Sequence, residues 1–282
     1  MFRSTVRFFL CVFLFCILFS NDGLSNPLGN DKTGGNNSPS GNNIIQDTIY
    51  TQRKTYLEID LSKQIAYLHF TDKEDYTFKV STGNPAIEKG VKTPIGLFVI
   101  QSKATFCRSK QFDNVPLLNW MGFNNGIGFH ALETSSYYRS LGRRPSSHGC
   151  VRVSREDSKE VFKYVVKGTP VLIHDGIPGL VVKFASQNEN YEKPDYNSLL
   201  SIIKNRSTYL KDSTIAKNSL PKIIIDDSNI QTEGVPIESY AALKSKAHTK
   251  SLLNKDLMKK TKKVKKSTDS TKVSTSSVPA IK

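Results

Sequence analysis

Three short segments between residues 55 and 80 alternate apolar and polar side chains with a period of two. They are Thr55–Asp60, Gln64–Phe70 and Tyr76–Val80. This period is typical of β-strands with one buried face. The connections at 60–63 and 71–75 are turns, so the chain folds back on itself twice. The pattern predicts an antiparallel meander and restricts the fold to one built around a β-sheet.

Further strand patterns follow this meander. Residues 83–90 contain glycine and proline and break the alternation, and residues 93–100 resume a strand behind Pro94. Short strands with glycine at tight places are expected around 120–123 and 126–130. The first half of the chain is therefore predicted to be rich in β-structure.

One helix and one buried strand complete the pattern. Ser154 is followed three residues later by Asp157, which is the spacing of a capping box at a helix start. Apolar residues between 161 and 166 recur at helical intervals, and Gly168 is expected to close the helix. A final buried strand is expected at 169–174. The sequence predicts a mainly β fold with one helix.

The first 20 residues have the composition of an export signal. Arg3 and Arg7 precede an apolar run from Phe8 to Phe19, which is shorter than the roughly 20 residues that cross a bilayer. We expect residues 1–20 to be a signal peptide or a short N-terminal anchor, and the protein to be exported to the periplasm or cell envelope. Residues 21–53 are rich in Asn, Gly and Ser and are expected to be a flexible linker.

Positive charge is concentrated at the C-terminal end. Residues 241–282 contain twelve lysines and two acidic residues, and so carry +10 of the formal net charge of +15. Residues 244–282 are expected to be a disordered Lys-rich tail, which is either attracted to anionic envelope polymers or simply solvated. The folded part then has no nucleic-acid face. Residues 176–243 are expected to be a poorly defined extension, with short helices at 198–204 and 238–246.

The hexapeptide Ser147–Arg152, with His130 upstream, carries the chemistry of the chain. Cys150 lies within it beside an imidazole, backbone amides and a guanidinium. A histidine within hydrogen-bonding reach and the charge of Arg152 would stabilise a thiolate, and Gly149 leaves its amide free to face an oxyanion. The helix start that follows would favour the anion further. These residues predict an activated cysteine nucleophile.

Two other uses of these side chains compete with this interpretation. Beyond the export signal the chain has two cysteines, Cys107 and Cys150. A disulfide between them would consume the nucleophile, so both are expected to be free, with Cys107 as a small buried side chain. A zinc site of His130, His148 and both cysteines is the competing chemistry, but the spacing lacks paired ligands. No metal is expected.

The other imidazole and aromatic side chains have plainer interpretations. His69 and His174 lie in predicted strands and are expected to be structural or exposed. Trp120 and Phe123 are expected to be core residues rather than a platform on which a sugar ring stacks. None of the four is needed for the reaction of the predicted nucleophile.

Several stretches of the chain resemble the YkuD family, the L,D-transpeptidase catalytic domain of bacterial cell-wall enzymes. In order along the chain, the similar stretches are Leu57–Gln64, Ser81–Gly83, Thr93–Phe98, His130, Leu141–Gly142, Ser147–Arg152 and Thr169–Ile173. The resemblance covers residues 54–175. It implies an L,D-transpeptidase-like β-sandwich or barrel with one helix after the catalytic cysteine, flanked by disordered tails.

The resemblance also implies a reaction. Cys150 would attack the carbonyl after the L-centre of the diamino acid in a peptidoglycan stem tetrapeptide, releasing D-alanine and leaving a thioester. His130 would take the thiol proton and later serve the amines as acid or base. The amides of Gly149 and Cys150 are the oxyanion-hole candidates. The residues with supporting roles are Ser147, His148 and Arg152. No cofactor is required, and a monomer is expected.

The acceptor decides the product and stays open at this point. The amine of a second stem would give a cross-link between two diamino acids, a protein lysine would give an anchored protein, and water would make the enzyme an L,D-carboxypeptidase that trims stems. Outside catalysis, the same groove would serve an envelope protein that only binds peptidoglycan. An intact His130 and Cys150 weigh against that last alternative.

Overall fold

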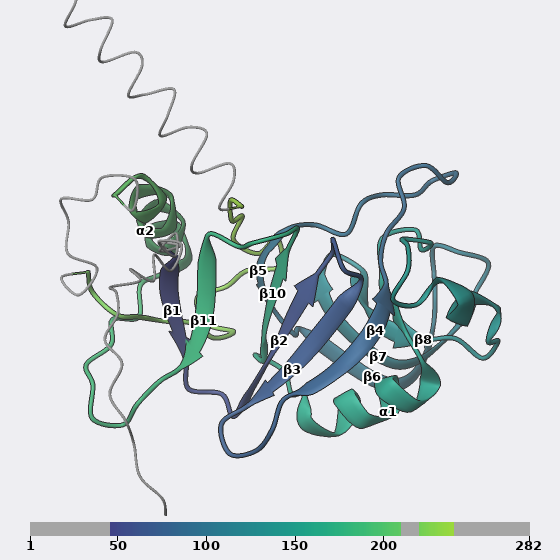
Figure 1. The fold of residues 1–282 in the computed structure, drawn as a ribbon, viewed down its shortest axis with the longest axis horizontal. Coiled ribbons are helices and arrows are strands. Elements are labelled where there is room, and N and C mark those ends of the chain that lie inside the picture. The colour runs from purple at the N-terminus through teal and green to yellow at the C-terminus, as the bar shows by residue number, and fades with distance from the viewer. Residues whose placement is uncertain (1–45, 210–219, 240–282) are drawn as a thin grey trace, which may run out of the picture. The chain divides into compact units, whose positions relative to one another are not determined.

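The computed structural model describes residues 46–209 and 220–239. This part forms two sheets, two α-helices and one short 3-10 helix, η1 (Figure 1). The predicted mainly β fold is confirmed. In chain order the elements are β1 Asp47–Thr51, β2 Thr55–Asp60, β3 Ile65–Phe70, β4 Tyr76–Ser81, β5 Gly96–Val99, β6 Ser102–Arg108, β7 Pro116–Asn124, β8 Ile127–Ala131, η1 Ser136–Ser140, β9 Val151–Val153, α1 Arg155–Tyr164, β10 Pro170–His174, β11 Leu180–Phe184, α2 Tyr196–Tyr209 and β12 Ile223–Ile224.

The larger sheet has nine strands in the order β5-β10-β2-β3-β4-β9-β8-β7-β6. Strands β2, β3 and β4 form the predicted antiparallel meander, in which Leu57 lies opposite Leu68 and Ala66 opposite Phe78. Strand β10 pairs in parallel with β2 and antiparallel with β5. The final strand of this sheet therefore lies beside the first strand of the meander.

Helix α1 begins where the sequence predicts it. The Ser154 side chain accepts a hydrogen bond from the Asp157 amide at 2.9 Å, as a helix N-cap does. The helix ends before Gly168, because Val165 takes up an extended backbone conformation. At this end the Lys103 ammonium of β6 donates to the Val165 carbonyl and to a carbonyl of the last turn.

A second, smaller sheet has the order β11-β1-β12, and β1 is parallel to both neighbours. Together with α2 it closes a second hydrophobic core against the outer faces of β5 and β10. Leu97 and Leu172 belong to this second core, whereas their neighbours Phe98 and Val171 belong to the first. Strands β5 and β10 are therefore buried on both faces, in keeping with the burial of every residue in them.

The smaller sheet corrects two predictions. The prediction that residues 21–53 form a flexible linker is wrong for Asp47–Thr51. This segment is strand β1, in which Ile49 is fully buried and pairs with both β11 and β12. The extension 176–243 is well defined where the structure describes it, since it supplies β11, α2 and β12. Helix α2 is also longer than the short helix expected at 198–204.

Other predictions concern parts of the chain that the structure does not describe. The export signal at 1–20 and the Lys-rich tail at 244–282 lie outside the described residues, as does most of the helix expected at 238–246. Within 46–209 and 220–239, no helix has the length and apolar composition needed to span a membrane.

His69 and His174 form an ionic cluster around Glu58. The Glu58 carboxylate lies 3.0 Å from His174 Nε2 and 3.3 Å from His69 Nε2. His69 Nδ1 lies 2.6 Å from Asp75 Oδ2, and His174 Nδ1 lies 2.5 Å from the Gly176 carbonyl oxygen. A ring with an acceptor at both nitrogens needs two protons. Burial disfavours all these charges, but the ion pairs and hydrogen bonds of the cluster outweigh it: the pKa of Glu58 falls to about 2, and both histidine pKa values rise. Both histidines are thus structural, as expected.

Candidate active site

Cys150 and His130 are brought together by the pairing of β8 with β9. These two strands run in parallel with His130 opposite Arg152, so Cys150, just before β9, reaches the same end of the sheet. Both side chains line one cavity of about 210 Å³. Ser147, His148 and Arg152 line it as well. Five of the six candidate residues from the sequence therefore surround a single space.

His130 is held as a neutral imidazole with a defined tautomer. The ring is buried, and its Nδ1 lies 3.1 Å from the Ala131 carbonyl oxygen. Because a carbonyl only accepts, Nδ1 carries the proton and Nε2 keeps its lone pair. Burial lowers the pKa of His130 to about 4, aided by the charge of Arg152 and opposed by the Ala131 hydrogen bond. The ring is therefore ready to accept a proton at Nε2.

The surroundings of Cys150 oppose the loss of its thiol proton in the resting protein. Burial raises the pKa of its thiol above the ordinary value of 9.0, and a backbone hydrogen bond at Gly128 and the charge of Arg152 offset this only in part. The predicted help from a helix start is also absent, because β9 separates Cys150 from the N-cap Ser154 and the helix dipole acts only near the first turn. Burial thus opposes a charge on both Cys150 and His130, which line the same cavity.

Hydroxyl groups fix the loop that carries Cys150. Ser147 Oγ donates to the Cys150 carbonyl at 2.5 Å and accepts from the Gly149 amide at 3.1 Å. Thr93 Oγ1 donates to the Gly149 carbonyl at 2.7 Å and accepts from the Gly83 amide at 2.8 Å. The Gly149 amide is thus engaged within the loop, which contradicts its predicted place in an oxyanion hole. The Cys150 amide is the remaining candidate.

Thr93 and Gly83 are positioning residues that the sequence reasoning did not single out. A Cβ at Gly83 would lie 2.2 Å from the Val91 carbonyl oxygen and 2.7 Å from the Cα of Gly149, so only glycine allows the two loops to pack. The Thr93 side chain is buried, and its hydroxyl ties these loops together. Both residues lie in stretches that carry the family resemblance, which was the one signal that could have found them.

Arg152 connects the electrostatics of the site to its backbone. Its Nη1 donates to the Ser146 carbonyl at 3.1 Å and so holds the chain ahead of the nucleophile loop. Its positive charge acts to lower the pKa of both Cys150 and His130. One guanidinium therefore favours the neutral imidazole and eases the loss of the thiol proton.

Aromatic rings form part of the cavity wall. His148 stacks on Phe112 with ring centroids 4.4 Å apart, and both line the cavity. Trp120 also lines it, with its ring centroid 6.1 Å from that of His130, so it is not the core residue that the sequence predicts. Phe123 is fully buried in the first core, as expected.

Two observations bear on the competing interpretations. Cys107 and Cys150 are both free thiols, and Cys107 is half-buried rather than buried. In the part of the chain that the structure describes, no three His, Cys, Asp or Glu side chains are grouped so that they could hold a metal ion.

The part of the chain that contains Cys150 and His130 matches a known protein family. Residues 54–173 match the YkuD family, the L,D-transpeptidase catalytic domain. Residues 54–173 therefore resemble an L,D-transpeptidase catalytic domain. The match confirms the resemblance seen in the sequence. It includes the cavity wall from residue 109 to 152 and the Thr93 loop, and it leaves out β1, β11, α2 and β12.

The solved structures that are similar to this chain cover only part of it. An L,D-transpeptidase from Mycobacterium smegmatis is 16% identical, covers 43% of this chain and 58% of its own, and has a TM-score of 0.38. One from Stackebrandtia nassauensis is 26% identical over 50% of this chain and 63% of its own, with a TM-score of 0.38. An LD transpeptidase in complex with imipenem is 19% identical, covers 43% of this chain and 59% of its own, and also has a TM-score of 0.38. This chain thus spans less than two thirds of each. No curated protein sequence matches it.

Proposed function

We propose that this protein is exported to the periplasm or cell envelope and acts there, as a monomer, on peptidoglycan stem tetrapeptides through a cysteine thioester. The observation that carries the proposal is the cavity shared by Cys150 and His130, with His130 Nδ1 tied to the Ala131 carbonyl. A nucleophile beside a base that a third group orients is the arrangement used for acyl transfer.

In the first half-reaction Cys150 attacks the carbonyl that follows the L-centre of the diamino acid. The thiol proton passes to His130 Nε2 as the Sγ–C bond forms, and the carbonyl oxygen becomes an oxyanion that faces the Cys150 amide. Collapse of this intermediate breaks the bond to the terminal D-alanine, and His130 returns the proton to the departing amine. The thioester keeps the energy of the peptide bond, so no ATP is consumed.

In the second half-reaction the amine of another stem attacks the thioester. His130 accepts a proton from this amine and passes it to the departing thiolate of Cys150, which restores the neutral pair. The product is a cross-link between two diamino acids. A neutral imidazole suits both halves of the cycle, because each begins with a proton moving to Nε2.

Product analysis with a defined substrate tests this proposal. The full chain is incubated with a disaccharide tetrapeptide stem, and the products are separated and weighed by mass spectrometry. We expect free D-alanine together with a cross-linked dimer. Cys150→Ser should abolish both products, and Cys107→Ser, which alters the other described cysteine, should leave them unchanged. Absence of D-alanine with the unaltered protein would contradict the proposal.

The same assay separates the alternative acceptors and functions. A tripeptide stem without any dimer would assign an L,D-carboxypeptidase. Sedimentation with purified cell walls but no D-alanine would assign a protein that only binds peptidoglycan. Because an LD transpeptidase has been solved in complex with imipenem, this β-lactam is a second probe, and we expect its ring carbonyl to acylate Cys150.

A further inference from the structure

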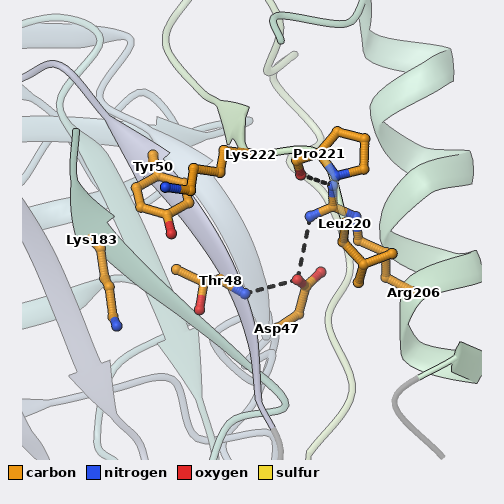
Figure 2. A pocket seen from close by; sticks show the side chains of 8 residues that line it. All are labelled: Asp47, Thr48, Tyr50, Lys183, Arg206, Leu220, Pro221 and Lys222. Carbon is orange, nitrogen blue, oxygen red and sulfur yellow. Dashed lines mark hydrogen bonds and ion pairs between the residues drawn. The ribbon is translucent and has the colours of Figure 1, made fainter. Parts of the chain in front are cut away.

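The small sheet β11-β1-β12 carries a cavity of its own. The cavity has a volume of about 240 Å³ and is lined by residues of β1, β11, α2 and the segment before β12 (Figure 2). All of its lining residues lie outside 54–173. The second hydrophobic core holds these elements together. This cavity is therefore a feature of the extension and not of the catalytic site.

Three side chains on one face of the sheet offer donors to this cavity. Thr48 and Tyr50 are two residues apart on β1 and so share a face, and Tyr50 lies opposite Lys183 in the register with β11. Figure 2 shows both hydroxyls and the Lys183 ammonium on the same side of the cavity. Within 46–209 and 220–239, no hydrogen bond or ion pair engages these three groups.

The charges around the cavity leave it positive. Arg206 is buried and lies 3.4 Å from Asp47, so these two charges offset each other. Lys222 forms an ion pair with Glu189 and lies above the Tyr50 ring. Lys183 has no acidic partner among the described residues and keeps its full charge. The free donors of the cavity therefore lie in a region of positive potential.

This arrangement fits one small anionic group. Hydroxyl and ammonium donors form short, strong hydrogen bonds with phosphate and carboxylate oxygens. The Tyr50 ring packs against Tyr191 with centroids 5.1 Å apart, so its hydroxyl is the contact that it offers. We propose that this cavity binds a single phosphate or carboxylate group, either free or carried by a larger molecule.

Calorimetric titration of the full chain tests this site. Inorganic phosphate and acetate are added separately at constant ionic strength, and we expect saturable binding of at least one of them. Lys183→Gln and Tyr50→Phe should each weaken that binding about tenfold, because each removes a charge-assisted hydrogen bond and phenylalanine keeps the ring packing. Binding of phosphate alone would assign a phosphoryl group, and binding of both anions a general oxyanion site.

A matched control separates this site from the general basicity of the chain. Lys54 is exposed, lies outside the cavity and has no ion partner in the described residues, so Lys54→Gln removes the same charge and should bind like the unaltered protein. Thermal melts check that each variant is folded. If Lys54→Gln weakens binding as much as Lys183→Gln, if folded cavity variants bind normally, or if neither anion saturates, the proposal is wrong.

Discussion

The neutral Cys150–His130 pair predicts how the reactivity of the thiol depends on pH. An ordinary thiol is only a few per cent ionised at pH 7, and burial raises the pKa of Cys150 above the ordinary value. A thiolate paired with an imidazolium would instead be almost fully ionised there. The two descriptions therefore differ by at least about 30-fold in the concentration of thiolate, which alkylation by iodoacetamide measures directly.

The assay uses the full chain and follows the peptide that contains Cys150 by mass spectrometry after digestion, so that the other three cysteines of the sequence are not counted. We expect the alkylation rate of Cys150 to rise about tenfold per pH unit between pH 6 and pH 8. His130→Gln should change the rate at pH 7 by less than about threefold, because a neutral ring holds no thiolate. A rate that is level from pH 5 to pH 8 and collapses in His130→Gln would refute this description of the pair.

Three further predictions concern the groups that hold the site and the fold. Thr93→Val leaves buried backbone groups unpaired, so it should lower the free energy of unfolding by about 2 kcal/mol in denaturant titrations and slow acylation; unchanged stability would contradict the clamp. The cluster around Glu58 stabilises most between about pH 4.5 and 6.5, because its contribution is lost as pH falls toward 2 or rises through the raised pKa values of His69 and His174. Glu58→Gln should therefore lower the melting temperature more at pH 5.5 than at pH 9, and an equal effect at both would rule this out. Lys103→Met should cost about 1 kcal/mol of unfolding free energy through lost carbonyl contacts at the end of α1; thermal melts that match the unaltered protein would argue against that role.

The strands that the sequence predicts have one of two clear apolar patterns. In the meander, β3 alternates between buried and partly exposed side chains, whereas β10 is a short apolar run in which every residue is buried. Strand β6 is mostly exposed and, among the strands that the structure describes, pairs with β7 alone, so its residues carry no alternation. Strand β1 has one fully buried apolar residue, Ile49, which is too short a signal to separate it from a linker.

The candidate site shows a similar division. Cys150 shares one hexapeptide with Ser147, His148 and Arg152, so local sequence is enough to propose these four residues. The clamp of Thr93 on Gly149 joins residues 56 apart in the chain and depends on how two loops pack. The pKa of Cys150 is governed by burial, which the fold supplies and the neighbouring residues do not reveal. Sequence alone therefore predicts the reacting groups but not their resting protonation.

The most direct test of the account is whether Cys150 becomes acylated. The folded full chain is mixed with imipenem, its intact mass is recorded, and the modified peptide is mapped after digestion. The account predicts one imipenem adduct on the peptide that contains Cys150, no adduct in Cys150→Ser, and a normal adduct in Cys107→Ser. A folded protein that gains no adduct, or that gains it on another residue, would contradict the central claim that Cys150 is the nucleophile.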